Sequence, residues 1–279
     1  MTDSTTAHAR DALVEKVKEL RDLSSAGRVC ARDNLLTLAD AIPVSELRRI
    51  KTMVERAAEA PRDDWGTGVA DQYQPMASCY CLTDLTPQPF HDTADLPWVA
   101  KLEANCDAIR DELYACLADR AAVDGKLRTF NGESFGDWKA LLLNRAFRED
   151  TEILAKLPVT RALIDESPVA LEATISMLEP HTELKVHVDS YPMTLTYHLP
   201  LVVDDASVTV AGIEHEVETG RSLLFDHSFL HSAANRGDAR RIHLIFNVWH
   251  PALTQPEVTL LKMILPVVDD YLEDAGIDI

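Results

Sequence analysis

The sequence lacks the features that mark membrane-spanning, secreted and nucleic-acid-binding proteins. No apolar run reaches the roughly 18 residues that cross a bilayer, and the first 20 residues hold no apolar signal-peptide core. Positive charge is scarce, since 27 Lys and Arg face 46 Asp and Glu, for a formal net charge of −19. Nucleic acids and anionic membranes are polyanions, so neither is an expected partner. We expect a cytoplasmic protein with a solubilising acidic surface.

Cysteine is also sparse. The five cysteines are an odd number without zinc-ribbon spacing, which disfavours a disulfide framework; they are Cys30, Cys79, Cys81, Cys106 and Cys116. Reduced thiols fit a cytoplasmic location. The Cys79-Tyr-Cys81 pair would share one face of a strand, where packing as small hydrophobic residues is favoured over a metal or redox role.

The 279 residues suffice for one large domain with an appendage. Apolar spacing predicts helices at 11–23 and 45–60, with Ser45 as N-cap and Pro61 as the stop. We therefore divide the chain into an N-terminal helical extension, 1–60, and a main domain, 61–279. Packing against that domain is the favoured role of the extension. A lid, a homodimer interface and a contact with a carrier protein are the alternatives.

The main domain changes character along its length. Residues 61–97 are predicted irregular with a short strand near 77–82, and helices are predicted at 96–120, 151–165 and 255–274, with strand and turn mixed at 135–147. From residue 168 onward, short β-rich segments alternate with turns; they cover 169–178, 183–189, 193–203, 207–212, 214–218, 221–226 and 240–250. This pattern predicts a mainly β fold with flanking helices, as a sandwich, barrel or jelly roll.

Histidines concentrate in this β region, with eight of the ten between residues 181 and 250. His187 and Asp189 lie two apart on a predicted strand and so share one face. His231, from a distant strand, would complete a set of two imidazoles and one carboxylate. Such a facial set leaves positions open and suits non-haem Fe(II) that must also bind a co-substrate and O₂. A structural zinc site is less favoured because no cysteine lies nearby.

Arg241 begins an otherwise apolar strand, and alternation places it on the same face as His243. A buried arginine needs an anionic partner, for which a carboxylate bound by two hydrogen bonds is well suited. A structural salt bridge would be the favoured explanation for Arg241 alone, but next to a metal triad an anionic co-substrate is favoured. On another strand, Thr194, Thr196 and His198 share a face, which predicts a polar stripe lining the pocket.

Three stretches are similar to the aspartyl/asparaginyl β-hydroxylase family. The most specific is FDHSFLHSAANRGDARRIHLIFNVWHPAL, which has the family's Phe-Asp-x-Ser-x-x-His element followed by an Arg-led strand ending in Val-Trp-His-Pro. LTPQPFHDTADLPWVAKLEANCDAIRDEL resembles its Pro-rich entry and following helix, and SMLEPHTELKVHVDSYPMTLTYHLPL its strand pair with the first iron ligand. The resemblance spans roughly residues 75–253 and leaves 1–60 uncovered.

The resemblance implies a double-stranded β-helix, a cupin-like jelly roll that binds Fe(II) and 2-oxoglutarate. By position, His187 and His231 resemble the two iron-binding histidines. Arg241 and Ser176 resemble the pair that holds the distal carboxylate of 2-oxoglutarate, and His198 a contact to its other end.

Two positions depart from the family pattern. The animal protein-hydroxylating members have Gly two residues after the first histidine, whereas this chain has Asp189. The resulting H-x-D…H triad resembles bacterial proline hydroxylases and argues against a halogenase, which needs that carboxylate absent. Thr196 stands where relatives commonly place an arginine that helps to hold 2-oxoglutarate.

The sequence thus predicts a dioxygenase that uses Fe(II), 2-oxoglutarate and O₂, with ascorbate assisting. It would hydroxylate an unactivated C–H of an amino acid or amino-acid-derived small molecule and release succinate and CO₂. A peptide- or carrier-bound residue is the alternative substrate. A non-catalytic metal-binding jelly roll and a cupin-like isomerase or dioxygenase are the competing functions, which dependence on 2-oxoglutarate would separate. Structural roles are expected for His181, His215, His227 and His250, while His243 has a route to the pocket.

Overall fold

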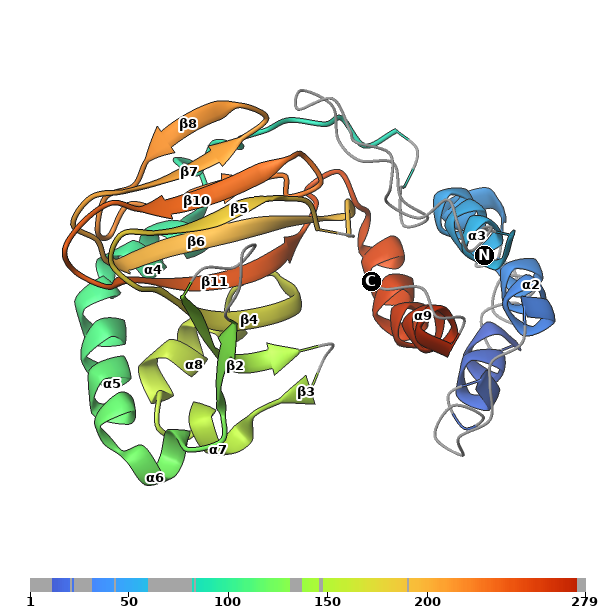
Figure 1. Cartoon of the computed structure of the whole chain (residues 1–279). Coiled ribbons are helices and arrows are strands. Elements are labelled where there is room, and N and C mark those ends of the chain that lie inside the picture. Colours follow the sequence, from blue (N-terminus) through green and yellow to red (C-terminus); the bar gives the residue numbers. More distant parts are fainter. Residues whose placement is uncertain are drawn as a thin grey trace.

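The structure is a computed structural model that describes residues 12–20, 22, 32–42, 44–59, 82, 84–130, 137–145, 148–189 and 191–274. Two antiparallel sheets form its centre, with helices on the outside (Figure 1). Among the described helices, none combines the length and the apolar character that crossing a membrane requires.

The larger sheet has seven strands in the order β1-β2-β4-β11-β6-β9, with β3 also pairing with β2. Its members are β1 (Leu127–Phe130), β2 (Trp138–Arg145), β3 (Arg148–Glu149), β4 (Val169–Leu178), β6 (Thr194–Val202), β9 (Leu223–Phe225) and β11 (Arg241–Trp249). The smaller sheet has the order β5-β10-β7-β8. It consists of β5 (Thr182–His187), β7 (Ala206–Val210), β8 (Ile213–Glu216) and β10 (His231–Asn235).

The strand order is that of a double-stranded β-helix. From β4 to β11 the chain passes back and forth between the sheets, so that β4 pairs with β11 in one sheet and β5 with β10 in the other. All of these pairings are antiparallel. The predicted mainly β jelly roll with flanking helices is therefore confirmed.

One strand of this core, β10, is absent from the strands that the sequence predicts. Its sequence HSAAN holds no β-branched or large aromatic residue, so its local strand signal is weak. It becomes a strand because β5 and β7 pair with it on both sides. Tertiary pairing, rather than local propensity, decides this segment.

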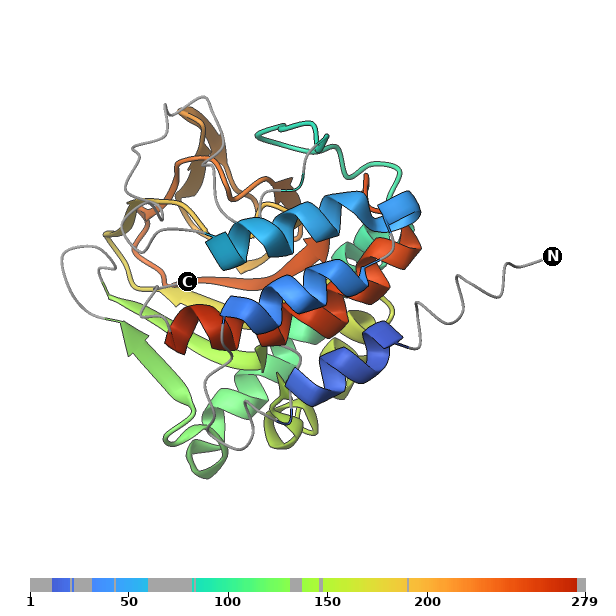
Figure 2. The same cartoon turned by 90° about the vertical axis from the view of Figure 1, so that its right-hand side faces the viewer.

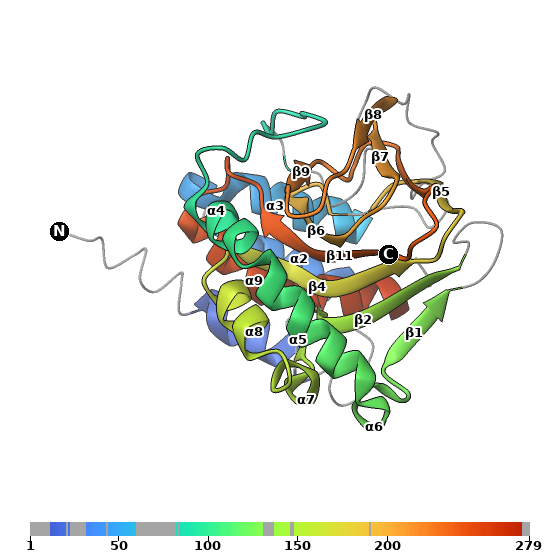
Figure 3. The same cartoon turned by 90° about the vertical axis from the view of Figure 1, so that its left-hand side faces the viewer.

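Alternation along β6 divides its side chains between two environments. Leu195, Tyr197 and Leu199 point outward into a buried core shared with α4 (Pro97–Ala104), α5 (Cys106–Ala118) and α8 (Pro158–Asp165). Figure 3 shows α5 and α8 lying along the outer face of this sheet. Thr194 and His198 occupy alternate positions on the opposite face and are buried inside the barrel. The inward polar stripe predicted from the sequence is thus in place.

Two predicted helices are each divided in the structure. The helix predicted at 96–120 breaks at Asn105, whose backbone has φ −108° and ψ 12°, into α4 and α5, and a short α6 (Arg120–Val123) follows. The segment 151–165 forms α7 (Thr151–Leu154) and α8, because Pro158 has no N–H and starts a new helix.

The N-terminal helices pack side by side with the last helix (Figure 2). Residues 12–20, α2 (Arg32–Ala41) and α3 (Val44–Glu59) share one apolar cluster with α9 (Gln255–Asp274), and the barrel residues Met193 and Trp249 belong to the same cluster. The helix α9 has the predicted bounds. Since α3 begins at Val44, Ser45 lies inside the helix instead of capping it.

Several expectations fall on parts of the chain that the structure does not describe. The stop at Pro61 and the residues Cys30, Cys79 and Cys81 lie outside the described residues, as does the strand predicted near 77–82 apart from Leu82.

Candidate metal centre and co-substrate pocket

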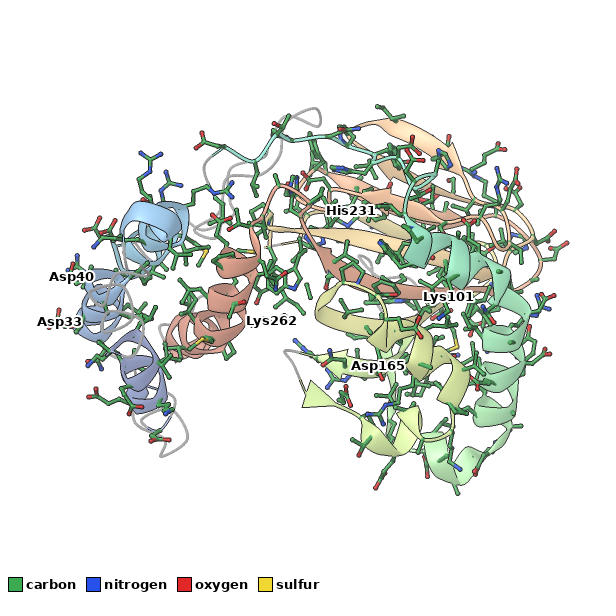
Figure 4. The ribbon with its side chains drawn as sticks, turned by 180° about the vertical axis from the view of Figure 1, so that it is seen from behind. Asp33, Asp40, Lys101, Asp165, His231 and Lys262 are labelled. Carbon is green, nitrogen blue, oxygen red and sulfur yellow. The ribbon has the colours of Figure 1, made fainter. Side chains whose placement is uncertain are left out.

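The three predicted metal ligands lie together at one end of the smaller sheet. His187 and His231 are directly opposite each other in β5 and β10, with ring centroids 4.1 Å apart. Asp189 follows β5, and its backbone N–H donates to the carbonyl of His227 at 3.0 Å. One ligand atom from each of the three side chains lies within 4.8 Å of the others. Figure 4 labels His231 among the side chains of the barrel.

Backbone carbonyls orient both imidazoles. Nδ1 of His187 lies 2.7 Å from the carbonyl oxygen of Lys185, and Nδ1 of His231 lies 2.9 Å from that of Phe229. When Nδ1–H donates to a carbonyl, the proton is fixed there and Nε2 keeps its lone pair for a metal. Nε2 of His231 lies 3.9 Å from Oδ2 of Asp189, a separation that a bridging ion can span.

The electrostatics of the cluster match the protonation state that a divalent metal requires. Burial, together with the neighbouring His187, lowers the pKa of His231 to about 4. Desolvation opposes ionisation of Asp189, but the hydrogen bond with His227 and the adjacent histidines hold its pKa below the ordinary value. Neutral imidazole and ionised carboxylate are the metal-binding forms. Two nitrogens and one oxygen on one side of a site suit Fe(II) better than structural zinc.

Arg241 is a buried cation without an anionic partner in the described part of the chain. It is 3% exposed, and its Nε and Nη1 form no hydrogen bond there. Burial lowers the pKa of Arg241 to about 10, so the guanidinium stays charged near neutral pH. The structural salt bridge that was the alternative explanation does not form among these residues. A buried charge of this kind is costly unless a ligand compensates it.

Ser176 lies beside Arg241 on the inner face of the larger sheet. Strand β11 pairs with β4 so that His243 stands opposite Ser176 and Arg241 opposite Leu178. Arg241 and Ser176 are therefore diagonal neighbours, close enough for both to contact one carboxylate. Oγ of Ser176 accepts a hydrogen bond from Nε1 of Trp138 at 2.9 Å, which leaves its own hydrogen free to donate.

His198 is under the influence of both Arg241 and the candidate metal ligands His231 and Asp189. Its Nδ1 is 3.3 Å from Nδ1 of His243, and both imidazoles are buried. Desolvation and the charge of Arg241 hold the pKa of each well below the ordinary value, so both rings are neutral. The structure thus places His243 in contact with His198; a role of His243 in ligand binding stays a prediction.

His227, expected to be structural, lies directly against the metal centre. It is 1% exposed, with Nδ1 2.7 Å from Oγ1 of Thr196 and 3.4 Å from Oδ2 of Asp189. Its Nε2 lies 3.0 Å from the carbonyl oxygen of Tyr191. Thr196, assigned to the co-substrate from the sequence, therefore also positions His227. The sequence could not place His227 beside Asp189, because it is the turn between β9 and β10 that brings His227 against Thr196 of β6. The clustering of histidines was the one signal in the sequence that pointed to such a role.

The model of the aspartyl/asparaginyl β-hydroxylase family matches residues 103–251, more than half of the chain. The chain belongs to this family. The match includes the metal triad and Arg241, while residues 75–102 of the resemblance described above lie outside it.

Similarity to individual family members is moderate. The chain is 34% identical over 200 residues to the mouse aspartate β-hydroxylase domain-containing protein 2, covering 66% of this chain and 57% of that protein. It is 27% identical over 173 residues to the ornithine lipid ester-linked acyl 2-hydroxylase of Rhizobium tropici, covering 58% and 61%. It is 28% identical over 187 residues to human aspartyl/asparaginyl β-hydroxylase, covering 63% and 24%.

The matched part of this chain thus covers less than two thirds of the length of each of these relatives. A solved Pseudomonas putida prolyl-4-hydroxylase aligns with 55% of this chain and all of that chain, at 16% identity and a TM-score of 0.37.

Proposed function

We propose that this family member is a non-haem Fe(II)- and 2-oxoglutarate-dependent hydroxylase. The observation that carries the proposal is the presence, on inward positions of one barrel, of a possible metal site and of a buried arginine without an anionic partner. His187, Asp189 and His231 converge as the metal site. Arg241 is buried and charged without an anionic partner among the described residues. A co-substrate that is both a metal chelator and a dicarboxylate completes the two together.

In this proposal the triad holds Fe(II), while Arg241 and Ser176 bind the distal carboxylate of 2-oxoglutarate. His198 contacts the end of the co-substrate near the metal. When bound, Fe(II), 2-oxoglutarate and O₂ supply the oxidising power to convert an unactivated C–H into C–OH, with release of succinate and CO₂.

The remaining residues of the pocket position these groups and keep water out. His227, itself held by Thr196, fixes the carboxylate of Asp189. The ring of Phe225 lies 5.1 Å from that of His198 and 5.7 Å from that of His231, centroid to centroid. This apolar ring excludes water between the metal site and the co-substrate anchor.

The substrate that we propose is a residue bound to a peptide or carrier. The sequence predicted a free amino acid as the substrate, but neither of the two relatives considered below is named for a free amino acid. One relative is named for an ester-linked acyl group of ornithine lipid and another for aspartyl and asparaginyl residues. In both cases the group belongs to a larger molecule, which supports the alternative.

Succinate formation from 2-oxoglutarate tests the proposal. The purified protein is incubated under air with Fe(II) and ascorbate, alone and with panels of free amino acids and short peptides. We expect weak turnover without substrate and an increase with peptides. His231→Ala should abolish turnover and metal binding. The matched control is His181→Ala, since His181 is an exposed histidine that precedes β5, at the end of that strand away from His187.

Metal content is measured in parallel by Mn(II) binding. A protein that binds metal and 2-oxoglutarate yet forms no succinate with any substrate would favour the non-catalytic scaffold. Stimulation by free amino acids alone would restore the small-molecule substrate.

A further inference from the structure

Strand β4 carries one charged residue, Glu172, and it lies on the inner face of the sheet. Alternation along β4 sends Ala173, Ile175 and Met177 into the outer apolar core and Glu172 to the same side as Ser176. Four residues of strand separate these two side chains, or roughly 13 Å. Glu172 therefore lies at the opposite end of the pocket wall from the co-substrate anchor.

Strand pairing places Glu172 near the metal centre. At its end of β4, Phe246 of β11 stands opposite Ala173, and the next residue, Asn247, has its Nδ2 3.5 Å from Nδ1 of His227. The charges of Asp189 and His227 both act on the carboxyl group of Glu172. In the proposed function, 2-oxoglutarate occupies the space between Arg241 and the metal, so the region of Glu172 remains for the substrate.

The carboxyl group of Glu172 is only partly compensated. Within the described part of the chain it forms no hydrogen bond and no ion pair within 4.0 Å. Arg145 stands opposite it in β2, and Arg128 lies on β1; both are exposed and act on it at longer range. Burial raises the pKa of Glu172 despite these two arginines. An incompletely compensated carboxyl group inside a pocket favours a cationic ligand.

We propose that Glu172 binds a cationic nitrogen of the substrate, so that the hydroxylated residue of the peptide or carrier bears a primary ammonium group. This inference rests on the proposed function for the position of the metal and the co-substrate. The competing explanation is a structural ion pair between Glu172 and Arg145, whose side chains do not approach within 4.0 Å. The two explanations predict opposite effects of removing Arg145.

The test measures binding next to the metal and needs no turnover. The full chain is loaded with Mn(II) and 2-oxoglutarate, and binding of both is confirmed first. The probes are n-butylammonium and n-butanol, which differ mainly in charge, and paramagnetic broadening of their methyl protons reports proximity to Mn(II). We expect broadening that saturates for n-butylammonium, at a Kd at least about tenfold below that of n-butanol.

Variants separate Glu172 from its surroundings. Glu172→Gln should weaken n-butylammonium binding about tenfold and leave Mn(II) and 2-oxoglutarate binding unchanged. Glu183→Gln, an exposed carboxylate on the strand that carries His187, is the matched control and should bind like the wild type. Arg145→Gln should strengthen n-butylammonium binding, because it removes a competing cation. If Glu172 and Arg145 instead form a structural ion pair, Arg145→Gln should lower the stability of the protein and leave n-butylammonium binding no stronger.

A second pair of probes tests the source of the ammonium group. Nα-acetyl-ornithine methylamide should bind more tightly than Nα-acetyl-norvaline methylamide, which lacks the ammonium group. If the two peptide probes bind equally while n-butylammonium still binds more tightly than n-butanol, the idea that the ammonium group belongs to a peptide side chain would be wrong. Equal binding of n-butylammonium and n-butanol, or no effect of Glu172→Gln, would overturn the role of Glu172. If the wild type fails to bind Mn(II) or 2-oxoglutarate, the proposed function itself would be contradicted.

Discussion

Arg241 is costly for stability and, in the proposed function, holds the co-substrate. Its guanidinium is buried at 3% exposure without a partner for Nε or Nη1 in the described part of the chain. Replacing an uncompensated buried charge with a similarly sized apolar group is often neutral or stabilising. The same replacement removes the proposed anchor of the co-substrate.

We therefore predict opposite effects of Arg241→Met on stability and on ligand binding. Without 2-oxoglutarate, the Tm of the variant should equal or exceed that of the wild type. With Mn(II) present, 2-oxoglutarate should raise the Tm of the wild type but not of the variant, and the Kd for 2-oxoglutarate should increase at least about 30-fold. Differential scanning fluorimetry and calorimetry measure both. A variant that loses stability without losing 2-oxoglutarate affinity would mean that Arg241 is purely structural.

His243 gives a prediction for pH. Its buried imidazole stays neutral because desolvation and Arg241 hold its pKa well below the ordinary value. In the unfolded chain the same imidazole binds a proton below about pH 6.5. The unfolded state thus takes up a proton that the folded state does not, and the free energy of unfolding falls as the pH drops below that value.

One histidine of this kind contributes about 1.4 kcal/mol to the difference in stability between pH 7.5 and 5.5. His243→Gln should reduce the measured difference by about that amount. Urea unfolding at the two pH values, in the wild type and the variant, provides the comparison. An unchanged difference would show that His243 is protonated equally in both states.

At the scale of elements, one ion pair joins the N-terminal helices to the last helix. Arg49 of α3 donates to Glu257 of α9 from Nε at 2.8 Å and from Nη2 at 2.6 Å. Glu257, 3% exposed, also accepts from the backbone N–H and the hydroxyl of Thr254 and so completes a capping box at the start of α9. One carboxylate thus stabilises both a helix terminus and the contact between two helices.

Glu257→Gln should lower the free energy of unfolding by about 2–3 kcal/mol, because it removes the carboxylate charge that faces the half-buried Arg49. The control is Glu55→Gln in the half-exposed pair with Lys51 one turn away on α3, where the oxygen lies 3.7 Å from Nζ. A change of about 0.5 kcal/mol or less is expected there. Urea unfolding gives both values. Equal effects of the two variants would contradict the special role of Glu257.

In the whole molecule, the residues of the proposed site come from both sheets. The candidate metal ligands lie on and after strands of the smaller sheet, and Arg241 with Ser176, the proposed co-substrate anchor, lies on the larger one. A ligand that joins the two should therefore stabilise the barrel beyond what the metal alone achieves. Each ligand stabilises the folded state by about 2.7 kcal/mol at 100 times its Kd.

We predict that Mn(II) and 2-oxoglutarate together raise the Tm by more than the sum of their separate effects. Asp189→Ala should remove this cooperativity, because it weakens the metal site through which 2-oxoglutarate is held. Thermal unfolding with each ligand alone and with both measures it. Strictly additive shifts in the wild type would mean that the two ligands occupy unconnected sites.

Much of this protein follows from local sequence pattern. Alternation in β6 and β11 correctly separated inward polar residues from outward apolar ones, because neighbouring strand residues always point to opposite faces. His187, Asp189 and Arg241 could be proposed together because they stand on predicted strands, whereas His231 was added from the clustering of histidines and the family resemblance. The bounds of α9 were also predicted correctly, and the structure adds the capping box of Thr254 and Glu257 at its start.

The remaining features depend on contacts between segments that are distant in sequence. HSAAN becomes strand β10 only because β5 and β7 pair with it, and the turn after β9 brings His227 against Asp189. Glu172 gains its character in the same way, since Asp189 and His227 approach it only in the folded barrel. The sequence by itself determined which side chains face inward. Tertiary structure alone decided which of them lie close together, because burial and pairing depend on segments that local pattern cannot place.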